Sequence, residues 1–308
     1  MGETNPRLRP GAAEPNGLRR TLIALAVAQV GIVVLLPFVS VISQALSHGL
    51  ATYGRALADP AGRSAIYLTL LVAAIAVPLN TFFGVWLAIG LARTRLRCRK
   101  FLITLLDLPF SVSPVVAGLL FVLLFGRNGW CGPWLEAHNI RIIFAVPGLV
   151  LATLFVTLPF VARELIPLLE AQGRDEEEAA MLLGASRWRV FQKITLPNIK
   201  WALLYGVILC NARAMGEFGA VSVVSGHIRG RTNTLPLHIE TLFNDYDFTA
   251  ACAMASLLAA LGLVTIIARA MAEWQTGKRR ESQNIEPETS TVENFPPPST
   301  LHPSASTQ

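Results

Sequence analysis

Two ionisable residues lie inside a stretch of the sequence that is otherwise apolar. Arg213 and Glu217 fall within residues 201–224 and are four positions apart, so in a helix they share one face and can form an ion pair. A lone charge in the middle of a membrane helix costs about 2.5–3.5 kcal/mol on insertion scales, so pairing, contact with water or both must offset it. The spacing therefore favours electrostatic chemistry: an ion pair that holds helices together, or a charged wall of an ion path.

A second polar cluster interrupts the apolar stretch at 101–125, and consists of Asp107, Pro109, Ser111, Ser113 and Pro114. Such groups are rarely turned toward lipid, so we expect them at a helix interface or along a watery path. A kinked interior helix without ligand contact explains them equally well, and the sequence leaves both interpretations open. The path hypothesis also includes two serines that follow Arg213 along its stretch, Ser222 and Ser225.

The sequence holds no group of residues that predicts catalysis. The phosphate-binding pattern Gly-x-x-x-x-Gly-Lys-[Ser/Thr] is absent, and no nucleophile lies beside a plausible base. The five histidines lack the spacings typical of metal ligands, and we interpret His48, His138 and His227 as solvated loop residues. We therefore expect neither an enzyme nor a chain that binds a metal or another cofactor of its own.

The polar stretch at residues 173–200, here called the 173–200 loop, separates two apolar stretches. It begins with four consecutive acids at 175–178, which favour the dipole of a helix that starts there. Small and apolar side chains can cover one face of that helix, namely Ala179, Ala180, Leu182 and Leu183. Gly184 can end or bend it, a second short helix is predicted at 187–193, and Pro197 suits the start of the next long helix. The loop is thus predicted to be a helix–turn–helix.

The elements that must position these groups are six long apolar segments. The 308 residues are 53% hydrophobic and only 15% charged, which is typical of a membrane protein rather than a soluble domain. A helix needs about 20 apolar residues to cross a bilayer, and lipid forces backbone polar groups to pair within helices. The segments that reach this length are 22–42, 65–91, 101–125, 142–162, 201–224 and 248–268. The sequence predicts an all-α, polytopic (multi-pass) membrane protein.

Lys and Arg residues are concentrated on one side of these segments. They gather before the first segment, between the second and third, in and around the 173–200 loop, and after the last segment. The loops on the other side hold only Arg55, Arg63, Arg127, Arg141, Arg229 and Arg231. By the positive-inside rule both termini and the 173–200 loop face the cytoplasm. The same bias accounts for the net charge of +6, so we expect membrane lipid as a partner and no nucleic acid.

The two ends of the chain differ in composition from the part between them. Both are polar; the first contains Pro and Gly, and the second is rich in Ser, Thr and Pro. Segments of this kind bury too little apolar surface to fold alone. We therefore predict a disordered cytoplasmic N-terminus at 1–18, a transmembrane domain at 19–274 and a disordered cytoplasmic tail at 275–308.

The 173–200 loop resembles the EAA loop of ABC-importer permeases. The residues that carry the resemblance are Glu178, Ala179, Ala180, Gly184, Ile194, Leu196 and Pro197, and they have the spacing of that pattern. The resemblance implies the fold of type I (MetI-like) importer permeases, with six transmembrane helices and a cytoplasmic loop that docks on an ATP-hydrolysing subunit. It also implies that ATP-Mg is bound by that partner and not by this chain.

Two further stretches narrow the resemblance. Residues 107–118 and 211–226 are similar to the sulfate/thiosulfate importer permeases, most of all to their W-type subunit. The resemblance implies a heterodimer with a sister permease subunit, two ATPase subunits and a periplasmic sulfate-binding protein. It places the complex in a bacterial plasma (inner) membrane.

Alternatives to a sulfate permease remain at this point. Molybdate permeases share the Arg-x-x-Gly-Glu-Phe-Gly pattern that starts at Arg213, so molybdate or another oxyanion is the first alternative. A secondary transporter that uses Arg213 and Glu217 as a proton relay is the second. It would be favoured by an inverted repeat, of which we see no convincing example in the sequence. A membrane-embedded enzyme is the third, and it lacks a candidate site.

Overall fold

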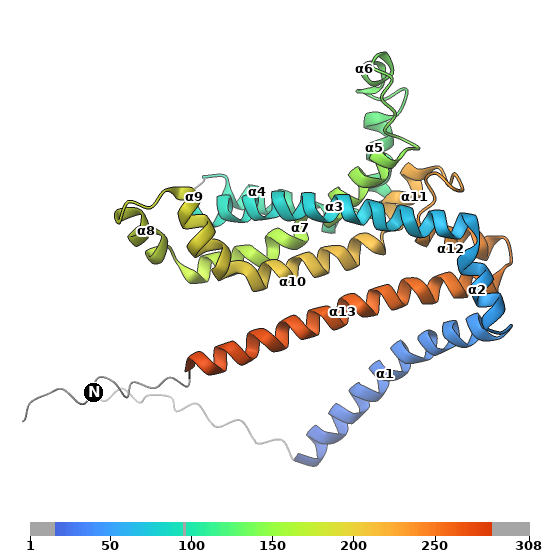
Figure 1. The fold of residues 1–308 in the computed structure, drawn as a ribbon, viewed down its shortest axis with the longest axis horizontal. Helices are drawn as coiled ribbons and strands as arrows, with labels where there is room; N and C mark the ends of the chain where they lie inside the picture. Colours follow the sequence, from blue (N-terminus) through green and yellow to red (C-terminus); the bar gives the residue numbers. More distant parts are fainter. Residues whose placement is uncertain (1–15, 95–96, 285–308) are drawn as a thin grey trace, which may run out of the picture.

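The computed structural model describes residues 16–94 and 97–284, and these are mostly helical (Figure 1). Four of the described helices are long and apolar enough to cross a membrane in one piece. They are α1 (Asn16–Leu46), α3 (Pro60–Arg93), α7 (Val146–Gln172) and α13 (Phe248–Asn284). Three of the six predicted segments lie entirely within these helices, and the fourth, 142–162, is helical from residue 146 onward.

The other two predicted segments are helical as well, but each is a pair of bent helices and not one straight helix. Segment 101–125 is divided into α4 (Arg99–Ser111) and α5 (Pro114–Phe125), which meet at 104°. Segment 201–224 is divided into α10 (Leu196–Met215) and α11 (Gly219–Ser225), which meet at 49°. The first break follows from Pro114, because a proline pushes the residue before it out of the helical conformation. Counting each bent pair as one span gives six spans.

The centre of the molecule is α7, which packs against α3 on one side and α10 on the other. Glycines allow this close approach: a Cβ added at Gly84 of α3 would lie 2.8 Å from the Cβ of Val161, and one at Gly206 of α10 would lie 3.2 Å from its Cα. A buried polar contact fixes the register of α3 on α7, because Asn80 Nδ2 donates to Thr157 Oγ1 at 2.6 Å. The three helices therefore form one tightly packed body.

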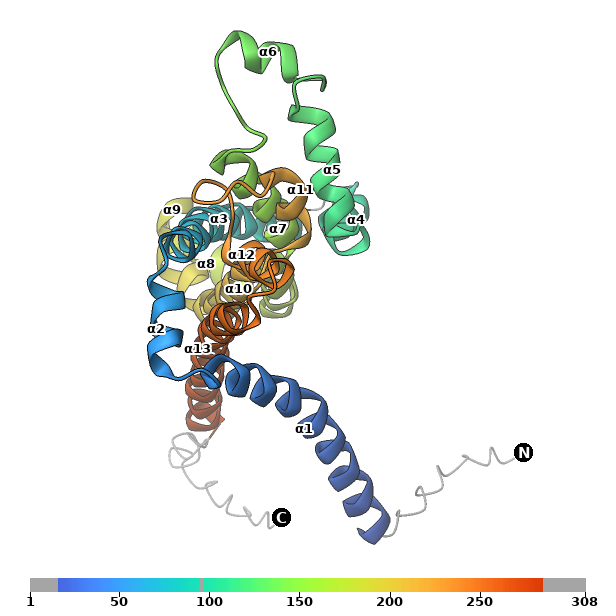
Figure 2. The ribbon, with the colours of Figure 1, turned by 90° about the vertical axis from the view of Figure 1, so that its right-hand side faces the viewer.

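The remaining elements surround this body. In Figure 1, α13 runs beside α10, while α5 and the short α6 (Gly132–Ala137) stand away from the body, as Figure 2 also shows. α1 packs on α13 and presents apolar side chains to the outside along most of its length. At one end, α2 (Leu50–Ala58) and α12 (Leu235–Asn244) join the bundle. At the other end lie α8 (Asp175–Leu182), α9 (Arg187–Val190) and a π-helical turn, η1 (Phe191–Thr195).

The helices extend further toward both ends of the chain than the sequence analysis predicted. α1 already includes residues 16–18, and α13 continues through 275–284, where disorder was expected. The Lys, Arg, Glu and Gln residues at 275–284 are good helix formers and can continue a helix that starts in an apolar segment. The rest of the predicted disordered ends, 1–15 and 285–308, lies outside the described residues.

Candidate functional site

The 173–200 loop folds as the predicted helix–turn–helix. α8 starts with the four acids in its first turn, and it is followed by Gly184, whose φ of +86° lies in the left-handed region that favours glycine. Ser186 caps α9, because its Oγ accepts a hydrogen bond from the N–H of Arg189 at 3.4 Å. α9 continues through η1 into α10, which has Pro197 in its first turn.

Arg93, near the end of α3, fastens this loop to the body. Its guanidinium pairs with Glu177 of α8 at 2.9 Å, and both side chains are largely buried. It also donates to the carbonyl oxygens of Leu169, at 3.1 Å, and of Gly173 at the end of α7. Glu177 in turn accepts a hydrogen bond from Thr195 Oγ1 in η1 at 2.8 Å. One arginine thus connects α3, α7 and α8 directly and reaches η1 through a shared carboxylate.

The surface of the loop that faces away from Arg93 is apolar. Leu182 and Leu183 are 89% and 90% exposed, and Trp188 is 65% exposed and stacks on Phe191 with ring centroids 5.5 Å apart. Both leucines belong to the face of α8 that the sequence predicted to be apolar, and that part of the face is exposed. Arg93 pulls the opposite side of α8 onto the body, so the leucines point outward. We call Leu182, Leu183 and Trp188 the apolar tip.

The other residues of the EAA pattern lie between the tip and the body. Leu196 packs against the main apolar core, and Ile194 and Ala180 are half-buried. Ala179 and Pro197 are exposed. Glu178 is exposed and lines an open cavity of about 400 Å³ at the base of the loop, together with Leu91, Thr94, Arg99, Glu170 and Arg174.

The second predicted site, the pair Arg213 and Glu217, spans the break between α10 and α11. Arg213 Nη1 lies 2.7 Å from Glu217 Oε2, as the four-residue spacing predicted. The Glu217 side chain is only 1% exposed, and its Oε1 accepts a hydrogen bond from the N–H of Ala220 at 3.0 Å. The carboxylate therefore caps the start of α11 while it holds an arginine at the end of α10. Its first structural effect is to fix the angle of the broken helix.

The structure brings the two broken helices together at their breaks. A Cβ added at Gly219 of α11 would lie 2.9 Å from the Cβ of Pro114, and one at Gly118 of α5 would lie 2.6 Å from the carbonyl oxygen of Ala220. Ser111 and Ser113, at the break between α4 and α5, are exposed. The predicted path residues of segments 101–125 and 201–224 thus come from adjacent elements.

Three further predicted path residues have partners within the chain. Asp107 of α4 forms an ion pair with Arg163 of α7, which the sequence analysis did not single out, at 3.3 Å. Ser222 Oγ donates to the carbonyl oxygen of Gly219 at 2.8 Å. Ser225 is fully buried, and its Oγ accepts a hydrogen bond from the N–H of His227 at 3.0 Å. In this conformation Ser225 stabilises the turn after α11 and does not reach the surface of the chain.

The end opposite to the 173–200 loop is held by neutral polar groups. Thr232 Oγ1 donates to the carbonyl oxygen of Ser225 at 2.6 Å, and Thr69 Oγ1 of α3 accepts from the N–H of Leu235 at 2.7 Å. His238 of α12 is almost completely buried, and this burial lowers its pKa below the usual value, against the attraction of nearby Asp59. α12 is thereby fixed on α3 by contacts that carry no charge.

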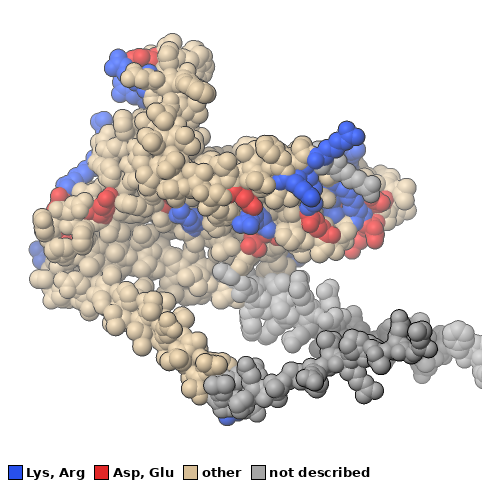
Figure 3. Space-filling view, turned by 180° about the vertical axis from the view of Figure 1, so that it is seen from behind, with Lys and Arg blue, Asp and Glu red and all other residues tan. Residues whose placement is uncertain are grey.

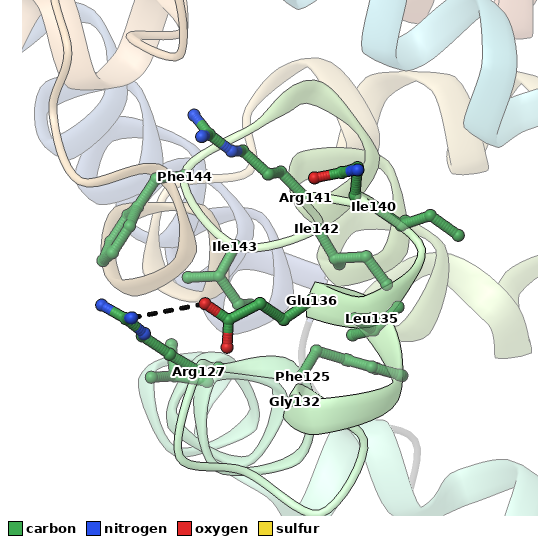
Figure 4. A pocket seen from close by; sticks show the side chains of 13 residues that line it. Phe125, Arg127, Gly132, Leu135, Glu136, Ile140, Arg141, Ile142, Ile143 and Phe144 are labelled. Atoms are coloured by element: carbon green, nitrogen blue, oxygen red, sulfur yellow. Dashed lines mark ion pairs between the residues drawn. The ribbon is translucent and has the colours of Figure 1, made fainter.

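A pocket of about 650 Å³ lies between α5, α6 and the chain that leads to α7 (Figure 4). Apolar side chains form much of its wall, among them Phe125, Leu135, Ile142 and Phe144. At its mouth Arg127 and Glu136 form an exposed ion pair at 3.3 Å, which is the dashed contact in the figure. The pocket lies on the part of the chain that stands away from the body.

The chain is similar to known transport proteins over most of its length. The family model described as binding-protein-dependent transport system inner membrane component matches residues 80–280. The sulfate transport system permease protein CysW of Synechococcus elongatus is 52% identical, with 84% of this chain and 90% of that protein covered. CysW of Escherichia coli K12 is 49% identical, with 89% and 94% covered. CysT, the sulfate transport system permease protein of the same strain, is 36% identical, with 80% and 90% covered.

The fold is also found in a solved transporter. The crystal structure of a bacterial ABC transporter involved in the import of the acidic polysaccharide alginate matches with a TM-score of 0.71, covering 84% of this chain and 96% of that one. Its sequence identity is 17%, so it informs on the fold alone. The fold is that of ABC-importer permeases, and with the family model and the relatives above it means that this chain belongs to the binding-protein-dependent transport system inner membrane components.

Proposed function

We propose that this chain is the membrane-spanning permease subunit of an ATP-driven ABC importer that moves sulfate and thiosulfate into the cytoplasm. The CysW relatives are sulfate transport system permease proteins, and this supports the choice of sulfate. The observation that carries the proposal is the apolar tip: three large apolar side chains are exposed on a polar loop whose base is fastened to the membrane helices. Such a surface suits the docking of another protein.

The partner that docks on this tip is the ATPase subunit, in two copies per complex, and it binds ATP-Mg and supplies all catalysis. The EAA residues Glu178, Ala179, Ala180, Gly184, Ile194, Leu196 and Pro197 form the coupling element. Arg93 then transmits a movement of α8 directly to α3 and α7, because it contacts all three. The complex also contains a sister permease, in a heterodimer, and a periplasmic sulfate-binding protein.

The anion path runs along the two broken helices. Discontinuous helices at membrane depth are tolerated where they border protein or a water-filled cavity. Arg213 lowers the barrier for a doubly charged anion, while Glu217 prevents the site from becoming a trap. Asp107, Ser111, Ser113, Ser222 and Ser225 complete the path, and Ser225 takes part only if the turn after α11 rearranges.

An exchange of charges separates a path role of Arg213 and Glu217 from a purely structural one. The double variant Arg213→Glu, Glu217→Arg keeps an ion pair but reverses its order along the path. If the pair borders the path, the variant assembles with its partners but transports little sulfate. Recovery of transport in the exchanged protein would assign the pair to structure alone, and full uptake by the double alanine variant would exclude both roles.

In the proposed orientation, the chain spans an inner (plasma) membrane, and the 173–200 loop and both termini lie in the cytoplasm. The bias of Lys and Arg toward that side supports it. A reporter enzyme fused after Gln275 is expected to be active only inside the cell. Activity only on the outer side would overturn the topology.

The choice of ion and of energy source is tested by uptake. In a strain that lacks its own sulfate importer, the complete complex is expected to take up labelled sulfate, with molybdate competing poorly. Preferred uptake of molybdate would favour the first alternative, a permease for another oxyanion. Uptake that survives ATP depletion and collapses with the proton gradient would instead favour a secondary transporter.

A further inference from the structure

Arg163 is a charged side chain that directly follows the apolar segment 142–162 inside a long helix. It lies in α7, about 14 Å along the helix before the end at Gln172. Its partner Asp107 lies about 12 Å from the start of α4 at Arg99. Arg163 belongs to a helix that is long and apolar enough to span a membrane, and Asp107 belongs to a bent pair of helices that meets the same criterion. A guanidinium at this depth must contact protein or water, because exposure to hydrocarbon is too costly.

The seam between α4 and α7 carries two ion pairs of opposite order. Nearer the 173–200 loop, Arg99 of α4 pairs with Glu170 of α7. Deeper in the membrane, Asp107 of α4 pairs with Arg163 of α7. On the face shown in Figure 3, charged side chains lie across the middle of the helical body as well as at its ends. The seam thus carries charged side chains from the loop end toward the centre of the body.

Arg163 and Arg213 differ in how tightly their carboxylates hold them. The pair Arg213–Glu217 is 2.7 Å long and its carboxylate is 1% exposed. The pair Arg163–Asp107 is 3.3 Å long, runs through Nε, and leaves the Arg163 side chain 56% exposed. Neither contact has hydrogen-bond geometry, so the two pairs differ in the longer distance and the greater exposure of Arg163 with Asp107. Arg163 can therefore exchange its partner more readily than Arg213.

The aromatic neighbours of Arg163 keep its guanidinium in place without neutralising it. The guanidinium carbon lies 5.1 Å from the ring centroid of Phe110, which is within the range of cation–π attraction. Phe110 in turn packs edge-on against Phe160, with centroids 5.2 Å apart. The arginine is therefore oriented by a ring face on one side and held weakly by a carboxylate on the other.

We propose that Arg163 binds the transported oxyanion on the path, and that Asp107 is the counter-ion which the anion displaces. The proposal rests on the proposed function, because it assumes that a small oxyanion passes this chain. A guanidinium presents several N–H donors in a planar fork that suits tetrahedral oxyanions. Asp107 balances the charge when the path is empty, and its return to Arg163 favours release of the anion toward the loop end.

The first test compares Arg163→Gln and Arg163→Lys in the complete transporter, reconstituted with its sister permease, ATPase and binding protein. Arg163→Gln is expected to lower the rate of sulfate uptake about tenfold or more, while ATP hydrolysis stimulated by the loaded binding protein is retained. Arg163→Lys keeps the charge and is expected to retain a substantial part of the uptake. Arg99→Gln, which breaks the other pair of the same seam, is the matched control and is expected to stay within about twofold of the parent.

The second test restores the charge chemically. In a chain with its four cysteines replaced by Ser or Ala, Arg163→Cys is expected to lose uptake in the same way. Reaction with an aminoethyl methanethiosulfonate, which attaches a positive group through a disulfide, is expected to recover transport, and a neutral reagent of the same size is not. Added sulfate is expected to slow the reaction with the cationic reagent, because the anion occupies the same place.

Two results would overturn the inference while the wild-type complex still transports sulfate. One is normal uptake by Arg163→Gln. The other is loss of complex assembly in both Arg163→Gln and Asp107→Asn, which would make the pair a contact between permease subunits. A wild-type complex that moves no sulfate at all would instead contradict the proposed function itself, so the two failures are distinguishable.

Discussion

The two ends of the helical body are held together by different chemistry. At the end with the 173–200 loop, charged groups make the contacts, above all Arg93 with Glu177. At the opposite end, neutral groups make the buried contacts: Thr69 accepts a backbone hydrogen bond from Leu235, and His238 is buried. Charged contacts at that end lie at the surface, as the exposed pair of Arg229 with Asp245 does. The first end also exposes the apolar tip.

This difference indicates which end is suited to move. The half-exposed pair of Arg99 with Glu170 at the loop end can exchange partners, because solvent compensates for a broken contact, whereas the largely buried pair of Arg93 with Glu177 holds. Breaking a buried neutral hydrogen bond at the opposite end leaves an unsatisfied group. We therefore expect the outer contacts of the loop end to change during transport, while Arg93 keeps Glu177 and the buried contacts of the opposite end persist.

The largest effect is expected from Arg93→Met. The change leaves Glu177 largely buried without its cation, and breaking a buried pair in this way costs about 3–5 kcal/mol. The loop should detach from the body, which limited proteolysis detects as faster cleavage within 173–200. Arg99→Met removes the half-exposed pair with Glu170 and one hydrogen bond to the carbonyl oxygen of Leu91, and serves as control. If Arg93→Met is cleaved no faster than the control, the loop is held by other contacts.

Removal of the apolar tip is expected to weaken docking without loosening the loop. Trp188→Ala should reduce binding of the ATPase subunit by about 2 kcal/mol, the size of an interface hot spot. Trp130→Ala is the matched control, because Trp130 is 92% exposed but lies in the turn between α5 and α6. Binding is measured by titrating the purified membrane complex with ATPase subunit. Equal losses in both variants would contradict the assignment of the tip.

Substitutions at Gly184 are expected to have a smaller effect, because only the backbone conformation of the turn resists them. A Cβ there meets no atom within 4 Å, so the cost of a side chain comes from the positive φ and not from a collision. Gly184→Val should destabilise the turn by about 1–2 kcal/mol, while Gly184→Asn should be better tolerated. Sulfate uptake and co-purification of the ATPase compare the two. Identical behaviour would show that the left-handed turn is not required for docking.

The smallest effect is the loss of stability on acidification that we expect from His238, at the end opposite to the 173–200 loop. Burial lowers the pKa of His238, so the unfolded chain takes up a proton at a higher pH than the folded one does. Stability is therefore lost as the pH falls from the ordinary histidine pKa toward the lowered value, and is regained on returning to neutral pH. Thermal unfolding at about pH 5.5 and 7.5 tests this, and His238→Gln should reduce the difference. An unchanged difference in that variant would assign the acid sensitivity elsewhere.

The sequence predicted the features that depend on neighbours along the chain. The apolar segments, the helix–turn–helix with Gly184 at its turn, and the pair of Arg213 with Glu217 follow from spacings of a few residues. Hydropathy also located segment 101–125, yet it carried no information on the 104° angle between its two halves. That angle depends on Pro114 and on the packing of α5 against α11, which no local pattern contains.

The contacts between distant segments were not predictable in the same way. Arg93 and Glu177 are separated by two predicted segments, and Asp107 reaches Arg163 only because α4 lies antiparallel beside α7. The outward direction of Leu182 and Leu183 has the same origin, because it is decided by the arginine on the other side of α8. The sequence shows basic residues at 93–100 and acids at 175–178, and it does not tell which of these basic residues meets which acid.

The close contacts at Val161 have a mechanical consequence. With Gly84 against one side of this residue and Gly206 against the other, α3, α7 and α10 cannot slide past each other without steric collision. We expect these three helices to tilt as one rigid unit when the 173–200 loop is displaced. Bending is then confined to the two helix breaks at 112–113 and 216–218. A displacement of the loop therefore reaches the break beside Glu217 almost undiminished.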